Sequence, residues 1–237
     1  ENGMINDSLQ ATKLGLKSIP ESAEQLIIER DLRLLENYNT KYHIALISSK
    51  KSLEIIKNAK DRGLKFTVGV SINNLSLNEN DIGDFKTFLK LSPPLRSEED
   101  RLALIDGVKQ GLINVIVSDH KPEDEESKRL TFQQATTGAS GIESLLSLGL
   151  ELVHNGSCDL NTLINNLTSN PAKILGIRNG TLSVGSEADI AVFDLNKPWV
   201  FKKENIKSKS KNTAIEDRKL QGKVEKTFIN GDLVFSE

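Results

Sequence analysis

The sequence is poor in the residues that build disulfides and metal clusters. Its 237 residues include one cysteine, Cys158, and three histidines, His43, His120 and His154. A single cysteine excludes an internal disulfide framework and is typical of a protein that works in a reducing cytoplasm. Three histidines are too few to assemble a ligand-rich metal cluster from this chain alone. For His154 and Cys158 we expect only structural roles.

Charge of one sign and long apolar runs are also missing. The 31 basic residues nearly balance the 33 acidic ones, giving a net charge of −2. This balance gives no electrostatic reason to expect a nucleic acid or an anionic membrane as partner. No apolar run approaches the roughly 20 residues that a membrane-spanning helix needs. Residues 1–7 have neither the basic nor the apolar region of a secretory signal peptide. We therefore expect a cytoplasmic location.

Strand and helix patterns alternate through the first three quarters of the chain, at intervals of roughly 25 to 30 residues. This rhythm predicts a parallel α/β architecture. Pro20 and the acids after it open the first long helix, and Gly63 closes the next one. The predicted strands are 42–47, 66–70, 87–91 and 115–119, and the predicted helices are 20–34, 51–61, 97–111, 141–154, 159–167 and a short one after Pro171.

The pattern changes near Gly176. Short β-type runs follow at 180–182, 189–194 and 226–235, and the last contains an Asn-Gly-Asp turn typical of a hairpin. About 60 residues of short strands are few for an independent sheet domain, so we expect them to pair with strands outside the chain or to pack on the first part. Residues 202–211, rich in lysine, are interpreted as a solvated surface loop. We predict two units, residues 1–177 and 178–237.

The strongest chemical signal is the end of the strand at 115–119. A β-branched apolar run there is followed by Ser118, Asp119 and His120. In a (β/α)8 barrel the carboxyl ends of the strands form the active-site face. A carboxylate beside an imidazole suits a metal site or a proton-transfer pair.

Four segments carry a resemblance to a known family. Residues 91–101 read LSPPLRSEEDR, 118–123 read SDHKPE, 169–176 read SNPAKILG and 180–189 read GTLSVGSEAD. In this order they resemble the dihydroorotase family of amidohydrolases, whose segments include NPPLRSEEDR, TDHAPH and TNPAKILGL. The resemblance implies the C-terminal portion of a (β/α)8 barrel followed by a small β-domain. It also implies that the chain, which does not begin with Met, is part of a longer protein.

The family implies zinc, which activates the water that opens a cyclic amide, and a role in pyrimidine biosynthesis. Two family histidine positions are changed here. The family's HIAHVST segment reads HIALISS, so Leu46 occupies a ligand position, and its VTPHHL segment reads VSINNL, with Asn73 at another. Leucine offers zinc no lone pair, and an amide is a poor substitute for imidazole. We expect weak or absent zinc binding.

The remaining family positions are partly kept. Asp119 stands where the family has a metal-binding or proton-shuttling Asp, so it is the candidate catalytic residue and a vestigial metal ligand. Ser92, His120 and Glu123 fall at candidate substrate positions, and Glu123 replaces a family His with a charge that would repel carboxylates. For His120 a structural hydrogen bond to a neighbouring loop is the simpler interpretation. For His43, in a strand, it is a packed or hydrogen-bonded core role.

Two classes of function remain. In the first, the chain belongs to a working zinc-dependent hydrolase that converts dihydroorotate and water to carbamoyl aspartate. In the second, it belongs to a degenerate, non-catalytic subunit, a pseudoenzyme that supports aspartate carbamoyltransferase in an oligomer, as some members of the family do. Two lost imidazoles and the charge reversal at Glu123 favour the second class.

Overall fold

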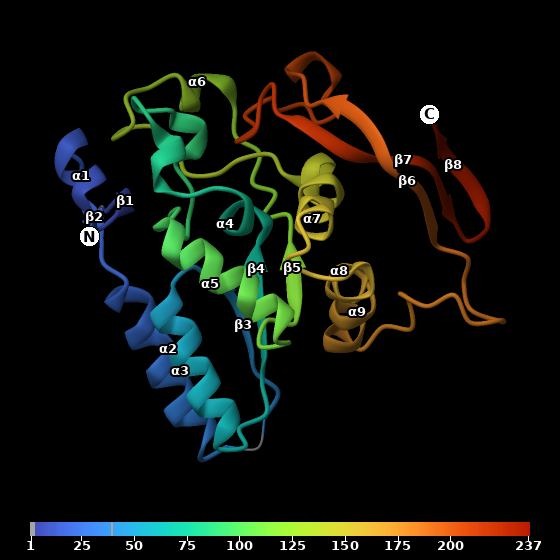
Figure 1. Ribbon diagram of the computed structural model, residues 1–237, viewed down its shortest axis with the longest axis horizontal. Helices are drawn as coiled ribbons and strands as arrows, with labels where there is room; N and C mark the ends of the chain where they lie inside the picture. Colours follow the sequence, from blue (N-terminus) through green and yellow to red (C-terminus); the bar gives the residue numbers. More distant parts are fainter. Residues whose placement is uncertain (1–2, 39) are drawn as a thin grey trace.

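A short parallel sheet lies at the centre of the chain in the computed structural model, which describes residues 3–38 and 40–237. The sheet has the order β3-β4-β5, formed by β3 (His43–Ile47), β4 (Thr67–Ser71) and β5 (Val115–Val117). Figure 1 shows helices on both sides of these strands. The α/β architecture predicted from the alternating pattern is confirmed for this part of the chain.

The helices that connect and cover the sheet begin where the sequence has capping residues. Ser97 and Asp100 form a capping box at the start of α5, and Asp159 caps α8 through the backbone N–H of Thr162. Helix α2 packs on α3, and α3 packs on α5. The α-helices are α1 (Leu9–Leu14), α2 (Ser22–Leu35), α3 (Lys50–Asp61), α4 (Ile72–Ser76), α5 (Glu98–Lys109), α6 (Glu125–Lys128), α7 (Leu145–His154), α8 (Leu160–Leu167) and α9 (Ser169–Leu175).

The hydrophobic core lies between the sheet and these helices. Ile47, Val68 and Val70 of the strands and Ile56 of α3 are completely buried. Short strands β1 (Ile5–Asn6) and β2 (Ser18–Ile19) form a separate parallel pair. The strands of the central sheet therefore lie in an apolar environment and bring their polar carboxyl-end residues to one edge.

The strand predicted at 87–91 is wrong. Thr87–Leu89 form the 3-10 helix η2. Other short 3-10 helices are η1 (Glu79–Ile82), η3 (Ile142–Ser144) and η4 (Lys203–Asn205). The apolar and β-branched side chains there resemble a strand in sequence. However, the backbone turns, with Lys86 N–H bonded to Ile82, and the Thr87 hydroxyl donates to the Lys128 carbonyl at 2.6 Å.

The last part of the chain forms an antiparallel sheet of β6 (Ile190–Val200), β7 (Lys219–Ile229) and β8 (Asp232–Ser236). The predicted hairpin is confirmed, because β7 and β8 pair around Asn230 and Gly231, whose φ angles are 52° and 88°. Such positive φ values suit Asn and Gly in a tight hairpin turn. The β-run predicted at 180–182 is wrong, because these residues have no regular structure. In Figure 1 this sheet extends away from the central one, and β7 also packs on α7.

Within the described part of the chain, no helix has the length and apolar character needed to cross a membrane.

Candidate functional site

The carboxyl ends of β4 and β5 bring together the residues that carry the strongest chemical signal. Ser71, the last residue of β4, pairs in register with Val117, the last residue of β5. Ser71 also caps α4, because its hydroxyl accepts the backbone N–H of Asn73 at 3.2 Å. Asp119 follows β5 by two residues. The edge therefore collects a hydroxyl, an amide and a carboxylate from two neighbouring strands.

Asp119 occupies a constrained and partly buried position. Its φ of 47° lies in the left-handed region, which Asp tolerates better than most residues. Burial raises the pKa of its carboxyl group, whereas the Lys121 charge and a hydrogen bond from the Ser71 side chain act in the opposite direction. A carboxyl group in this environment holds a proton more readily than a solvated one. That property suits proton transfer.

Asn73 is buried beside this edge with one polar group unsatisfied. The residue is 3% exposed, and its Nδ2 has no hydrogen-bond partner among the described residues. The next residue, Asn74, is equally buried but donates from Nδ2 to the Pro94 carbonyl at 3.0 Å. Burying an amide N–H without a hydrogen-bond acceptor costs free energy. The Asn73 side chain therefore does not stabilise the fold through a hydrogen bond from Nδ2.

Leu46 and His43 lie on β3, next to β4. Leu46 is half-buried and brings an aliphatic side chain to the position where the family resemblance implies a histidine. His43 begins the strand, far from its carboxyl end, and its Nδ1 lies 2.8 Å from the Thr67 hydroxyl. Burial lowers the pKa of His43. This histidine is therefore hydrogen-bonded between two strands at the amino end of the sheet.

The side chains at this edge do not fit a zinc ion. Zinc sites in proteins use imidazole, thiolate and carboxylate ligands, and here Leu46 offers no donor, Asn73 offers an amide and Asp119 offers a single carboxylate. Across residues 3–38 and 40–237, no group of three or more His, Cys, Asp or Glu side chains is arranged to hold a metal. The described residues therefore supply one carboxylate, that of Asp119, toward such a site.

His120 is engaged with the chain that follows α6. It forms a parallel bridge with Ala139, and its Nδ1 accepts the backbone N–H groups of Gly141 at 3.2 Å and of Ile142 at 3.4 Å. A neutral imidazole that accepts at Nδ1 carries its proton on Nε2. His120 therefore positions the 139–142 backbone through one nitrogen and keeps a donor on the other.

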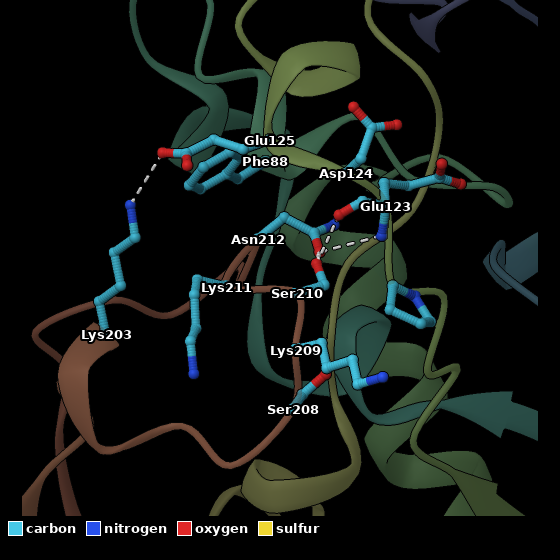
Figure 2. A pocket seen from close by; sticks show the side chains of 11 residues that line it. Phe88, Glu123, Asp124, Glu125, Lys203, Ser208, Lys209, Ser210, Lys211 and Asn212 are labelled. Carbon is cyan, nitrogen blue, oxygen red and sulfur yellow. Dashed lines mark hydrogen bonds and ion pairs between the residues drawn. The ribbon is translucent and has the colours of Figure 1, made fainter.

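Glu123 lies in a cleft of about 630 Å³ between residues 122–125 and 203–212, and Asp119 is not among the residues that line it. The Glu123 backbone is fixed there, because its N–H donates to Asn212 Oδ1 at 3.1 Å and its carbonyl accepts from the Ser210 hydroxyl at 2.5 Å. Figure 2 shows these contacts and the Glu123 side chain directed away from Asn212. Ser92 is exposed, and its bond to Pro93 is cis.

Two buried residues near this cleft had no distinguishing signal in the sequence. Asn212 is 3% exposed and connects three segments, because it also donates to the Gly138 carbonyl at 3.1 Å and accepts from the Ser140 hydroxyl at 3.2 Å. Lys128 is 1% exposed. The stretch around it has the composition of a solvated loop, but residues 125–128 form helix α6, and Lys128 is its buried residue. Asn and Lys are usually surface residues, so composition alone could not reveal either one.

A sequence model described as the amidohydrolase family matches residues 1–234. The chain is 41% identical over 236 residues to a protein named dihydroorotase from Ehrlichia canis, covering 99% of this chain and 53% of that protein. It is 39% identical over 238 residues to a dihydroorotase of Acetivibrio thermocellus, covering 100% of this chain and 56% of that protein. The chain thus spans about half the length of the curated relatives it matches.

Solved structures give a similar result. An L-hydantoinase (dihydropyrimidinase) from Arthrobacter aurescens superimposes with a TM-score of 0.84 at 28% identity, covering 90% of this chain and 49% of that one. A dihydropyrimidinase from Brevibacillus agri gives a TM-score of 0.87 at 23% identity, covering 98% of this chain and 51% of that one, and so supports the fold alone.

Proposed function

Because the chain belongs to the dihydroorotase family of amidohydrolases, we propose that it serves pyrimidine biosynthesis as part of a non-catalytic subunit that supports aspartate carbamoyltransferase. Its two sheets would then be the C-terminal portion of a (β/α)8 barrel and a small β-domain. The boundary at residue 177 remains a prediction. The relatives named dihydroorotase support a role in pyrimidine biosynthesis, because dihydroorotase is an activity of that pathway.

The donor set at the carboxyl end of the sheet carries this proposal. Amidohydrolases generally use a metal such as zinc, and the histidine positions implied by the resemblance hold Leu46 and Asn73. Each lost ligand weakens a zinc site strongly, so two losses leave little reason for tight binding. The core around the edge is nevertheless well packed, with Val68 and Val70 completely buried. Most substitutions destabilise a fold, so an intact core without its metal ligands favours a role that depends on shape.

A working dihydroorotase is the second candidate, and one observation favours it. Asp119 keeps the position of the family's acidic residue, and burial raises the pKa of its carboxyl group as a proton-transfer role requires. In that case the zinc ligands would have to come from elsewhere in the protein.

One experiment separates the two candidates. The full-length protein that contains this chain is purified with and without aspartate carbamoyltransferase from the same source, and dihydroorotate hydrolysis is measured for wild type and Asp119→Ala. We expect a complex that stabilises or activates the carbamoyltransferase, no hydrolysis by the protein alone, and no effect of Asp119→Ala on the complex. Asp84→Ala, at an exposed position, is the matched control. Hydrolysis that disappears in Asp119→Ala and persists in Asp84→Ala would establish the enzyme instead.

A further inference from the structure

Lys128 is a buried amine whose hydrogen bonds, within the described part of the chain, go to backbone carbonyls. The residue is 1% exposed, and its Nζ donates to the carbonyls of Thr136 at 2.7 Å and Gly138 at 3.0 Å. Among the described residues it forms no ion pair with a carboxylate. A buried ammonium group without a bonded counter-charge is expensive to keep.

A second buried amine lies under the same stretch of chain. Lys90 is 8% exposed, and its Nζ donates to the carbonyls of Gln133 at 3.0 Å and Ala135 at 2.7 Å, while the amine lies 5.9 Å from the centre of the Phe132 ring. Together the two lysines hold four carbonyls between residues 133 and 138. Segment 133–138 therefore covers the amines of Lys90 and Lys128 and accepts their hydrogen bonds.

The charges around Lys128 are unbalanced. Lys90 and Lys121 repel its protonated form, and Glu123 alone among the charged groups that act on it attracts that form. Burial is the largest influence, and it lowers the pKa of Lys128 to about 8. The acids of α6 itself face other cations, since Glu125 pairs with Arg129 and Lys203, and Glu126 lies 3.9 Å from Arg129.

Segment 133–138 continues directly into the backbone that contacts His120. The Gly138 N–H donates to the Lys90 carbonyl at 2.9 Å, and Ala139 forms the bridge with His120. Gly138 has a φ of 141° and lies against Lys121, so a side chain at this position would collide. The conformation of the segment is thus coupled to the loop that carries Asp119 and His120.

We propose that residues 133–138 form a proton-coupled flap, which in mildly alkaline solution takes up a proton on the Lys128 amine when it opens and releases that proton to solvent when it closes. Opening hydrates the amine and frees it from Lys90 and Lys121, so the open state binds the proton more tightly. Closing transfers the amine to an environment that favours its neutral form. A neutral amine keeps two N–H donors, enough for the Thr136 and Gly138 carbonyls.

The direction of the pH effect follows from proton linkage. Below about pH 8 both states are protonated, and the opening equilibrium does not depend on pH. Above that value the closed state loses its proton first, so the equilibrium constant for opening should fall by about tenfold per pH unit until the open-state lysine also titrates. The flap therefore opens more readily at neutral pH than in mild alkali.

Hydrogen exchange measured with millisecond pulses between about pH 7 and pH 10 tests this directly on the full protein. After correction for base-catalysed intrinsic exchange, the amides of Thr136 and Gly138, bonded to Ser127 and Lys90, should show the predicted fall in opening. The amides of α3 should show no such change. If the opening equilibrium of this segment, obtained from the corrected exchange rates, does not depend on pH, the proposal is wrong.

Lys128→Met should abolish the pH dependence, because it removes the titrating group while keeping an apolar chain of similar length. Lys60→Met is the matched control. Lys60 is half-buried, and its amine donates to the Leu112 carbonyl at 2.8 Å in another part of the fold. A pH dependence that survives Lys128→Met, or that disappears in Lys60→Met, contradicts the proposal.

A titration of the wild-type protein decides the matter even if Lys128→Met fails to fold. Lysine side chains labelled with ¹³C at Cε are followed by NMR as the pH rises. One resonance should titrate near pH 8, the value to which burial lowers the pKa of Lys128. If every lysine resonance titrates in the ordinary range, near about 10.4, the flap has no proton to exchange and the proposal is wrong.

Discussion

The guanidinium of Arg96 donates from Nε to the hydroxyl of Ser48 at 3.1 Å, and both residues are buried. Ser48 in turn donates its hydroxyl to Glu24 of α2 at 2.5 Å. Arg96 also donates from Nη1 to the Asn6 side chain at 2.8 Å and to the Ile19 carbonyl at 2.6 Å. This one side chain therefore joins the end of β3 to both strands of the β1-β2 pair.

Replacing Arg96 should destabilise the fold strongly. Arg96→Met removes a buried cation and leaves the Ser48 hydroxyl, the Asn6 side chain and the Ile19 carbonyl without their donor. We therefore expect a loss of about 3–5 kcal/mol in the free energy of unfolding. The measurement is urea denaturation of the protein at neutral pH. Arg33→Met is the control, since Arg33 forms an exposed pair with Glu36 that is worth less than about 1 kcal/mol. Equal losses in the two variants would show that the buried hydrogen bonds of Arg96 stabilise the fold no more than one exposed ion pair does.

The sequence predicts the elements that depend on local signals. The helix beginning at Ser97 and the hairpin around Gly231 are confirmed, because a capping box and an Asn-Gly turn each act within a few residues. The strand at 87–91 is wrong because its conformation depends on a distant contact, the bond between the Thr87 hydroxyl and the Lys128 carbonyl. Local patterns cannot show such a partner.

The candidate site was predictable to a similar degree. The pattern of a buried strand ending in Asp119 places that residue at the carboxyl edge, where the structure has it. The burial of Lys128 and the contacts of Asn212 depend on segments far apart in the chain. Polar residues at such positions have the composition of surface loops, so only the three-dimensional structure distinguishes them.

Asp119→Asn should stabilise the protein at neutral pH. Burial raises the pKa of Asp119, so the contribution of this carboxyl group to stability is complete below its unfolded pKa and is lost as the pH rises through the folded pKa. Asparagine keeps the shape, tolerates the positive φ and carries no charge. The midpoint of thermal unfolding of Asp119→Asn should therefore exceed that of wild type at pH 7 and match it more closely in acid. A lower midpoint at pH 7 would mean that the ionised carboxylate is stabilised by its surroundings.

Zinc content tests the interpretation of Leu46 and Asn73. After dialysis, the full-length protein should retain well under one zinc per chain, because neither side chain is a good zinc ligand. The double variant Leu46→His, Asn73→His should retain more zinc if these two positions face a common site. Elemental analysis checks both, with Leu34→His, at an exposed position on α2, as the control for nonspecific binding by an added imidazole. One or two tightly held zinc ions in the wild type would refute the interpretation.

Residues 1–237 expressed alone should associate through exposed strand edges. Every residue of β8 is exposed, including Leu233, Val234 and Phe235 at 54%, 55% and 43%, and β8 pairs only with β7 among the described strands. An apolar strand with an unpaired edge is a template for pairing with another chain, and a lysine on such an edge opposes it. We therefore expect oligomers in size-exclusion chromatography with light scattering, and a shift toward monomer in Val234→Lys. Leu34→Lys adds the same charge to an exposed apolar position of α2 and should leave the oligomers unchanged. A monodisperse wild-type monomer with a cooperative melt would show that the chain satisfies its own edges.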